Sequence, residues 1–583
     1  MPSPAIVDAV RRAFSLLPAV TTGDPAAMRR PGKPSSEASL PPSAAAVTMP
    51  PALIRWLNRA TYGTTPELVA EVASLGTTDA ERWEAWVEQQ LVPESIPDPE
   101  IDVRITPTSH PTLFKSLTQL WADHNVADMQ RNRPIVETEC AKLVRAVYSK
   151  RQLFEVMTDF WHDHFSTYGR HYDGQTVFVH YDRDVIRPNV FGNFRQMLGA
   201  VTRATTMMYF LDLRSNRRDG PNENFARELV ELHTLGAEHY AGVLRPDDPS
   251  LPSGMAYDGI DVRLRYVDED VYSATRALTG WSVRNGHWQY PDEDDGTFVF
   301  RPDWHDNYSK WVLDRFIQSY KGEMDGELLL DTLAAHPGTA VHVCRKLCRR
   351  LVADDPPESL VQSASEVFGS NWQAPDQLAR VVRHILLSNA FADTFDAKVT
   401  RPFVSVAHAM RVLHADFTPV YDSSSEWTVS EELFSRIEQT GHRPFGWAAP
   451  NGYPDHRNAW TSSGAMAMTW RLLSQLTVLR QSRDENAPYI ADIVAQTQAA
   501  LPVGQRSANA IVDYWIGRIN GFVPSAQRRT VLVDFMRQNA AADAELDIDS
   551  NAWNSGNLAA HYVQSRLRHM VGLILCLPDF HRR

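Results

Sequence analysis

One segment of the chain places two carboxylates at a spacing that suits chemistry. In the stretch 222–236 (NENFARELVELHTLG), Glu228 and Glu231 are three residues apart, so a helix presents them as neighbours. Neighbouring carboxylates can share a metal ion or a proton. Glu228 and Glu231 are therefore candidate catalytic and metal-binding residues.

A histidine follows these carboxylates on the same predicted helix. At about 100° per residue, the apolar stripe runs through Phe225, Leu229 and Leu232, with Glu228 on one side of it and His233 on the other. Glu228 and His233 therefore cannot bind one metal unless the helix ends between them. A structural interpretation is also open: Arg227 is spaced to form surface ion pairs, and His233 to cap the helix end.

The segment 160–166 (FWHDHFS) contributes a second candidate. On a helix His164 falls among aromatic and apolar residues, where a buried imidazole needs a hydrogen-bond partner or a metal. His162 points about 200° away from His164, so the two cannot chelate together on a regular helix. The sequence leaves both roles of His164 open.

Two further clusters combine histidine with acidic residues. His305 and Asp306 follow a predicted hairpin and precede Lys310, a combination that suits metal binding or acid–base work. Asp455 and His456 lie in a Gly/Pro-rich loop, which either holds binding residues or covers a core edge with aromatic side chains. The chain contains no GxSxG, HExxH, P-loop or GxGxxG signature.

The elements that must position these residues are mostly helices. We predict a mainly α, multi-helical globular body over 53–583, a flexible tail over 1–52, a β-hairpin at about 282–303 and a loop-rich segment over 415–461. Apolar periodicity predicts long helices, which span about 135–167, 176–200, 222–236, 268–281, 324–335, 338–354, 357–369, 374–391 and 400–414. Cys344 and Cys348 fall on an apolar helix face, which predicts core packing.

Bulk composition narrows the class of protein. The 583 residues are 43% hydrophobic and 22% charged, with a net charge of −13 spread along the chain, which argues against a nucleic-acid-binding surface. No apolar run is long enough for a transmembrane helix. The start of the chain has no convincing signal peptide, which favours a cytoplasmic location.

Several of these segments, in order, resemble the bacterial DUF1800 family. The hallmark is the pair 222–236 and YSATRALTGW (272–281); further matches are LNRATYGTTPELV, WVEQQL, FWHDHFS, RPDWHDNYSKWVL, HPGTAVHVCRKLCRRLVADDPP and GWAAPNGYPDHRNAWTSS. The resemblance spans about residues 53–583. It implies no known reaction. Because family members often carry secretion signals and are encoded beside DUF1501 proteins, it also implies an exported alternative and a DUF1501-type partner.

These observations lead to one preferred hypothesis and two alternatives. The preferred one is a metal-dependent hydrolase or oxidoreductase that uses Zn, Mn or Fe between helices. Its expected catalytic residues are Glu228, Glu231, His305 and Asp306, and its expected metal ligands are His164, Glu228, Glu231 and His233. The alternatives are a non-enzymatic binding or assembly protein, which works with a partner protein or a glycan through its aromatic surface, and a metal-free hydrolase with a carboxylate pair.

Overall fold

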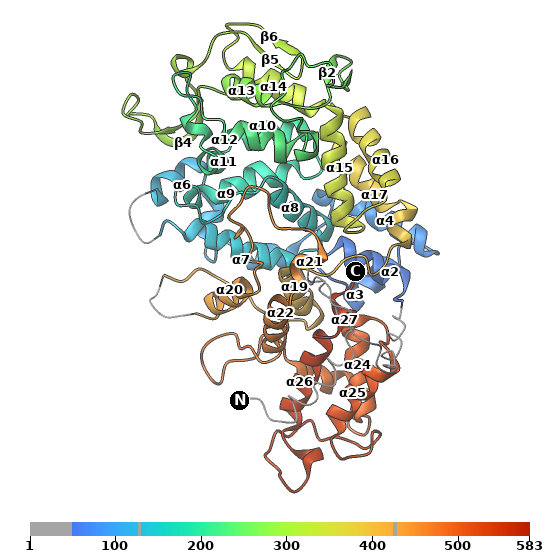
Figure 1. Cartoon of the computed structure of the whole chain (residues 1–583). Helices are drawn as coiled ribbons and strands as arrows, with labels where there is room; N and C mark the ends of the chain where they lie inside the picture. The colour runs from blue at the N-terminus through green and yellow to red at the C-terminus, as the bar shows by residue number, and fades with distance from the viewer. Residues whose placement is uncertain (1–48, 126–129, 424–427) are drawn as a thin grey trace, which may run out of the picture.

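The computed structural model describes residues 49–125, 130–423 and 428–583. Over these residues the chain is mainly helical, as predicted, and it has three two-stranded antiparallel sheets, of which the sequence predicted one (Figure 1). Most of the predicted tail, residues 1–48, lies outside the described residues.

A first hydrophobic core is built by the helices drawn from blue to yellow in Figure 1. They are α2 (Ala52–Ala60), α3 (Pro66–Ala73), α4 (Asp79–Gln90), α5 (Pro99–Arg104), α6 (Leu117–His124), α7 (Arg133–Tyr148), α8 (Gln152–His164), α9 (Phe178–His180), α10 (Phe194–Arg203), α11 (Thr205–Phe210), α12 (Asn224–Glu228), α13 (Asp268–Ala277), α14 (Met324–Ala334), α15 (Pro337–Leu351), α16 (Glu358–Ser370), α17 (Gln377–Leu386) and α18 (Asn389–Asp393). Cys344 and Cys348 are free thiols buried in this core, as predicted.

A second core lies beneath the first and is drawn in orange and red (Figure 1). Its helices are α19 (Pro402–Val412), α20 (Val429–Gln439), α22 (Ser463–Leu476), α23 (Ile493–Ala500), α24 (Ala508–Asn520), α25 (Ala526–Arg537), α26 (Val563–Leu575) and α27 (Pro578–His581). The short helix α21 (Arg457–Trp460) precedes α22 and is not part of this core as the described residues define it. Helix α7 joins the two cores, because Val144 packs into the first and Leu143 into the second.

The strands form hairpins at the top of the molecule in Figure 1. They are β1 (Ser253–Met255) with β2 (Asp261–Arg263), β3 (Trp281–Asn285) with β4 (Asp294–Phe300), and β5 (Lys310–Val312) with β6 (Arg315–Ile317). The β3–β4 pair, in which Trp281 faces Phe300, confirms the hairpin predicted at 282–303.

Local sequence explains where the helices begin. Thr78 and Glu81 form a capping box at the start of α4, each accepting a backbone N–H of the other. Pro337 opens α15, and the side chain of His336 accepts the backbone N–H of Gly338.

The single helix predicted at 135–167 is wrong: it is two helices, α7 and α8. The first helix ends at Tyr148, and Ser149 follows it. The Ser149 hydroxyl donates to Asp98 (2.6 Å), and the backbone N–H of Lys150 donates to the same carboxylate (3.0 Å). The Asp98 carboxylate thus accepts the backbone N–H of Lys150 that a continuous helix would have used for its own ladder, while Ser149 still donates its backbone N–H to Arg145. The helix predicted at 176–200 is also interrupted, by a π-helical turn over Tyr181–Ile186 before α10 begins.

Among the described residues, no helix is long and apolar enough to cross a membrane.

Candidate functional site

Three segments that are far apart in the sequence meet around one polar recess of about 200 Å³. Helix α8 ends there, α15 runs along one side, and the loop that precedes α21 covers it. The residues that line the recess are Phe160, Asp163 and His164 from α8; Lys346, Arg349 and Arg350 from α15; and Asn451, Tyr453, Pro454, Asp455 and His456 from the loop.

Glycine lets the loop come close to α8. Gly452 has a φ of +71°, and a Cβ atom there would lie 2.0 Å from the backbone oxygen of Asp163. The neighbouring Tyr453 donates its hydroxyl to the backbone oxygen of Arg443 (2.7 Å) and packs against His442. The aromatic side chains of this loop therefore anchor it, while the glycine allows the close approach.

Asp163 is the carboxylate best placed for chemistry in this recess. Its Oδ2 atom lies 2.6 Å from Nη1 of Arg401, and its side chain keeps 23% of its surface exposed. Burial raises the pKa of Asp163 to about 6; Arg401 opposes this rise and Asp159 adds to it. No hydrogen bond or ion pair within the described part of the chain occupies its Oδ1 atom.

Lys346 supplies a cation whose pKa is shifted the other way. Burial lowers the pKa of this half-buried lysine to about 8, with Asp163 opposing the change and Arg349 adding to it. Over the residues that the structure describes, the ammonium makes no hydrogen bond or ion pair. An amine without a partner inside a recess is available to bind a ligand or transfer a proton.

Asp163 is linked through Arg401 to a buried ion network around Asp159. Asp159 forms ion pairs with Lys142 (2.7 Å), Arg401 (2.5 Å) and Arg350. Although burial alone would raise the pKa of Asp159, Lys142 and Arg401 hold it below its usual range. Asp159 is therefore a fixed anion that orients Arg401, whereas Asp163 keeps a pKa near neutrality.

His164 lies at the inner wall of the recess. It is buried among aromatic rings, and its Nε2–H donates to the backbone oxygen of His233 (3.1 Å). That hydrogen bond places the proton on Nε2, so Nδ1 keeps its lone pair, and Nδ1 is buried without a partner. Burial lowers the pKa of His164 well below its usual value, so the ring is neutral.

A π-helical turn explains why His233 comes close to His164. Helix α12 continues as a π-turn over Leu229–His233, which changes the angular step per residue. His233 is fully buried, while Leu232 is only half-buried, so the predicted apolar stripe is wrong at that position. Neither ring nitrogen of His233 has a hydrogen-bond partner among the described residues, and burial lowers its pKa to about 3.

His342 on α15 completes a cluster of three imidazoles. The ring centroids of His342 and His164 are 6.2 Å apart, and those of His164 and His233 are 6.4 Å apart. His342 faces the backbone oxygen of Leu232 (3.2 Å) and a carboxylate oxygen of Glu238 (3.0 Å). Both of these contacts use acceptors, so His342 makes both only when both of its nitrogens carry protons.

The predicted carboxylates of the hallmark helix lie apart from this recess. Glu228 and Glu231 are both half-buried. Burial raises the pKa of Glu228, and the nearby charge of Glu231 adds to this rise. Neither residue lines the recess. Of the two predicted surface pairs of Arg227, the one with Glu223 is present (3.1 Å); among the described residues the second partner of Arg227 is Asp268 (3.6 Å) and not Glu231.

His305 and Asp306 belong to a separate, closed cluster beside α13, α14 and β5, near the top of Figure 1. His305 lies 3.1 Å from Asp325, whose other contact is Lys310 (2.7 Å), and all three side chains have 0% exposure. Asp306 forms an ion pair with Arg276 (2.7 Å). The structure thus separates these two candidates from His164 and His233.

Metal binding finds only partial support in this arrangement. Within 49–125, 130–423 and 428–583, no group of three or more His, Cys, Asp or Glu side chains is arranged to hold a metal ion. His164 and His233 are brought together with unused nitrogens, but Glu228 and Glu231 do not join them.

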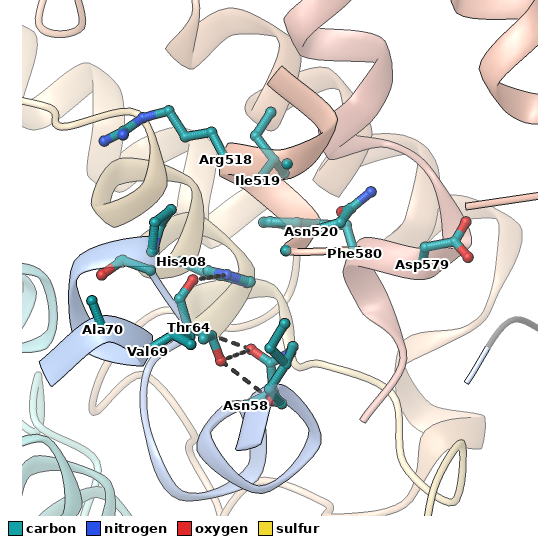
Figure 2. Close-up of a pocket in the computed structure, with 15 residues that line it drawn as sticks. Asn58, Thr64, Val69, Ala70, His408, Arg518, Ile519, Asn520, Asp579 and Phe580 are labelled. Atoms are coloured by element: carbon teal, nitrogen blue, oxygen red, sulfur yellow. Dashed lines mark hydrogen bonds between the residues drawn. The ribbon is translucent and has the colours of Figure 1, made fainter. Parts of the chain in front are cut away.

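A second recess, of about 290 Å³, lies between helices α2, α3, α19, α24 and α27 (Figure 2). His408 is neutral there, because burial lowers its pKa to about 3, and its Nε2–H donates to the backbone oxygen of Thr64 (3.1 Å). Asp579 forms an ion pair with Arg528 (2.7 Å). Within the described residues, this mostly apolar recess therefore has no counterpart of Asp163 and Lys346 in the first.

Sequence reasoning missed Asp163, Lys346 and Arg349. A signal for the two cations existed, because Lys346, Arg349 and Arg350 are spaced to share the face of α15 opposite Cys344. Asp163 stands between the two histidines of FWHDHFS and carried no signal of its own.

Comparison with known families places this chain in one of them. The family model described as "Protein of unknown function (DUF1800)" matches residues 55–582, so the chain belongs to the DUF1800 family. No curated protein and no solved structure matches the chain.

Proposed function

We propose that this DUF1800-family protein is an enzyme that performs acid–base chemistry on a small anionic substrate in the recess between α8, α15 and the loop before α21. The observation that carries the proposal is the pairing of Asp163 with Lys346. Both groups keep unused polar atoms in one recess, and their pKa values are shifted toward neutrality from opposite sides.

The shifted pKa values assign the roles. At pH 7 Asp163, with a pKa of about 6, is mainly deprotonated and acts as the general base. Lys346, with a pKa of about 8, is mainly protonated and acts as the general acid. In a hydrolysis, Asp163 takes a proton from the attacking water while Lys346 gives a proton to the leaving group. Activity is therefore highest between about pH 6 and 8.

The charges around the recess favour an anionic substrate. Three cations line it, Lys346, Arg349 and Arg350, against the carboxylates of Asp163 and Asp455. Arg349 uses its Nε–H for the backbone oxygen of Asp354 (3.1 Å), and no ion pair of this guanidinium occurs in the described residues. Arg349 and Lys346 are thus the groups available to bind a carboxylate or phosphate.

A metal-dependent version of this enzyme is the second candidate. Two observations favour it: Nδ1 of His164 and both nitrogens of His233 are buried without partners, close to the recess. Zn, Mn or Fe bound there would supply a Lewis acid or an activated water. Because only two histidines contribute, substrate or water would have to complete the coordination.

A binding role for a glycan or a partner such as a DUF1501-type protein rests on a different surface. Tyr308, Trp311, Phe316 and Tyr320 are strongly exposed on and beside the β5–β6 hairpin, where Trp311 packs against Phe316. Exposed aromatic clusters are typical of recognition surfaces. This role does not exclude chemistry in the recess.

Calorimetric titration with small dicarboxylates and inorganic phosphate tests the main proposal. We expect at least one of these anions to bind the wild type, and Lys346→Met and Arg349→Gln to bind it about tenfold or more weakly, the loss of one charged hydrogen bond. Lys321→Met, a change at an exposed lysine, is the matched control. Equal binding by all variants, or none by the wild type, would remove the basis for an anionic substrate.

A further inference from the structure

A smaller cavity adjoins the recess that contains Asp163 and Lys346, and cations surround this cavity. Its volume is about 30 Å³, and it shares Arg350 and Asp455 with the recess. Five cationic side chains line it, and among its described lining residues Asp455 has the single side-chain carboxylate; the cations are Arg59, Arg350, Lys398, Arg401 and Arg583.

Two of these arginines lack a carboxylate partner. Arg59 is 3% exposed and donates to the backbone oxygens of Phe391 and Arg55. Arg583 donates from Nε to the hydroxyl of Thr400 (3.0 Å). Neither guanidinium forms an ion pair in the part of the chain that the structure describes. Burial lowers the pKa of each to about 9, a sign of uncompensated charge.

The carboxylates near this cavity already form ion pairs with other cations. Asp455 lies 3.2 Å from Lys398, and Lys398 also binds Asp354 (3.0 Å). Arg401 is shared by Asp159 and Asp163, and its Nε atom is buried without a partner. Nη1 of Arg59 and Nη2 of Arg583 are likewise buried without partners. Burying a charged group without a partner is unfavourable, so a counter-ion is expected.

We propose that this cavity binds a halide-sized monovalent anion, and that this anion is chloride, which matches the cavity in size and charge. A water molecule needs about 10–15 Å³ of such volume, so 30 Å³ admits one chloride ion but not a dicarboxylate. The anion would lie between Arg59 and Arg583, offset one of their two positive charges, and lie beside Arg401, which holds Asp163. This inference does not depend on the proposed reaction.

Thermal unfolding in sodium chloride, sodium bromide and sodium gluconate at equal sodium concentration tests it. We expect the wild-type Tm to rise by several degrees from about 1 mM to about 300 mM halide and to stay nearly constant in gluconate, which is too large to enter. Arg59→Gln should lose the halide dependence without loss of stability in gluconate. Arg529→Gln, which breaks a pair with Asp513 on the surface, should keep it.

Crystals of the wild type soaked in bromide provide a readout that needs no variant. An anomalous peak between Arg59 and Arg583 supports the site. Equal Tm values in halide and gluconate would overturn the proposal, as would a Tm response that Arg59→Gln retains. A bromide peak without any effect on Tm would mark an adventitious ion only and would also overturn it.

Discussion

Nη1 of Arg401 lies 2.6 Å from Oδ2 of Asp163, and this one contact joins the N-terminus of α19 to the last turn of α8. The same guanidinium holds Asp159, so one arginine fixes two carboxylates. The two differ in outcome: the pKa of Asp159 falls, whereas burial raises that of Asp163 to about 6.

Removing this arginine should destabilise the fold strongly. Arg401→Gln leaves Asp163 without its ion-pair partner, and breaking a buried pair costs about 3–5 kcal/mol. Urea denaturation measures the change. The control is Arg383→Gln, whose partners Glu84 and Glu88 are exposed and for which we expect less than about 1 kcal/mol. Equal losses for both variants would contradict the assignment of Arg401 as the central cation.

Replacing Lys346 should stabilise the protein near neutral pH. The pKa of Lys346 falls from 10.5 in the unfolded chain to about 8 in the folded protein, so the folded state binds fewer protons between these values. Wild-type stability therefore rises with pH from about 8 to 10.5, and the charged lysine costs up to about 3 kcal/mol below pH 8.

Lys346→Met removes that cost, so its advantage over the wild type should be largest below pH 8 and shrink toward pH 10.5. Urea denaturation across this range measures it, with Lys321→Met as the control. An advantage that does not vary with pH would show that the pKa of Lys346 is normal.

Substitution of Gly452 should detach the loop that covers the recess. Gly452→Ala places a Cβ atom against the backbone oxygen of Asp163 and strains a positive φ, so we expect a loss of about 1–3 kcal/mol. Gly464→Ala is the matched control, because Gly464 lies in α22 with open space around it and should gain up to about 1 kcal/mol. Thermal unfolding of both variants provides the comparison.

Metal analysis separates the two candidate enzymes. If the metal-dependent version is correct, natively purified protein contains near-stoichiometric Zn, Mn or Fe, and His164→Ala and His233→Ala each lose most of it. Glu228→Ala tests the predicted carboxylate ligand separately. Elemental mass spectrometry reads the content directly; metal that persists in both histidine variants would place any metal site elsewhere.

Sequence reasoning reached the fold class and the family, because apolar periodicity and long ordered motifs are local signals. It also selected His164 and His233, which the structure brings together. It misjudged the face on which His233 lies, because a π-turn cannot be read from a 3.6-residue period.

The proposed acid–base pair could not be predicted from local sequence patterns. Asp163 and Lys346 are 183 positions apart, and their unusual pKa values arise from burial under a loop that belongs to neither helix. Periodicity assigns a residue to a helix face, but it does not show which charged faces meet. His305 and Asp306 illustrate the converse, since adjacent reactive residues proved to lie in a closed ion-pair cluster.

The ionisation of Lys346 tests the central claim most directly. The chain has only eight lysines, so reductive ¹³C-methylation gives a simple NMR spectrum in which Lys346→Arg identifies the Lys346 signal. We predict that this signal titrates with a midpoint near pH 8 and that Asp163→Asn moves the midpoint lower, because Asp163 raises the pKa of Lys346. A midpoint near 10.5 that Asp163→Asn leaves unchanged would contradict the assignment of these two residues as an acid–base pair.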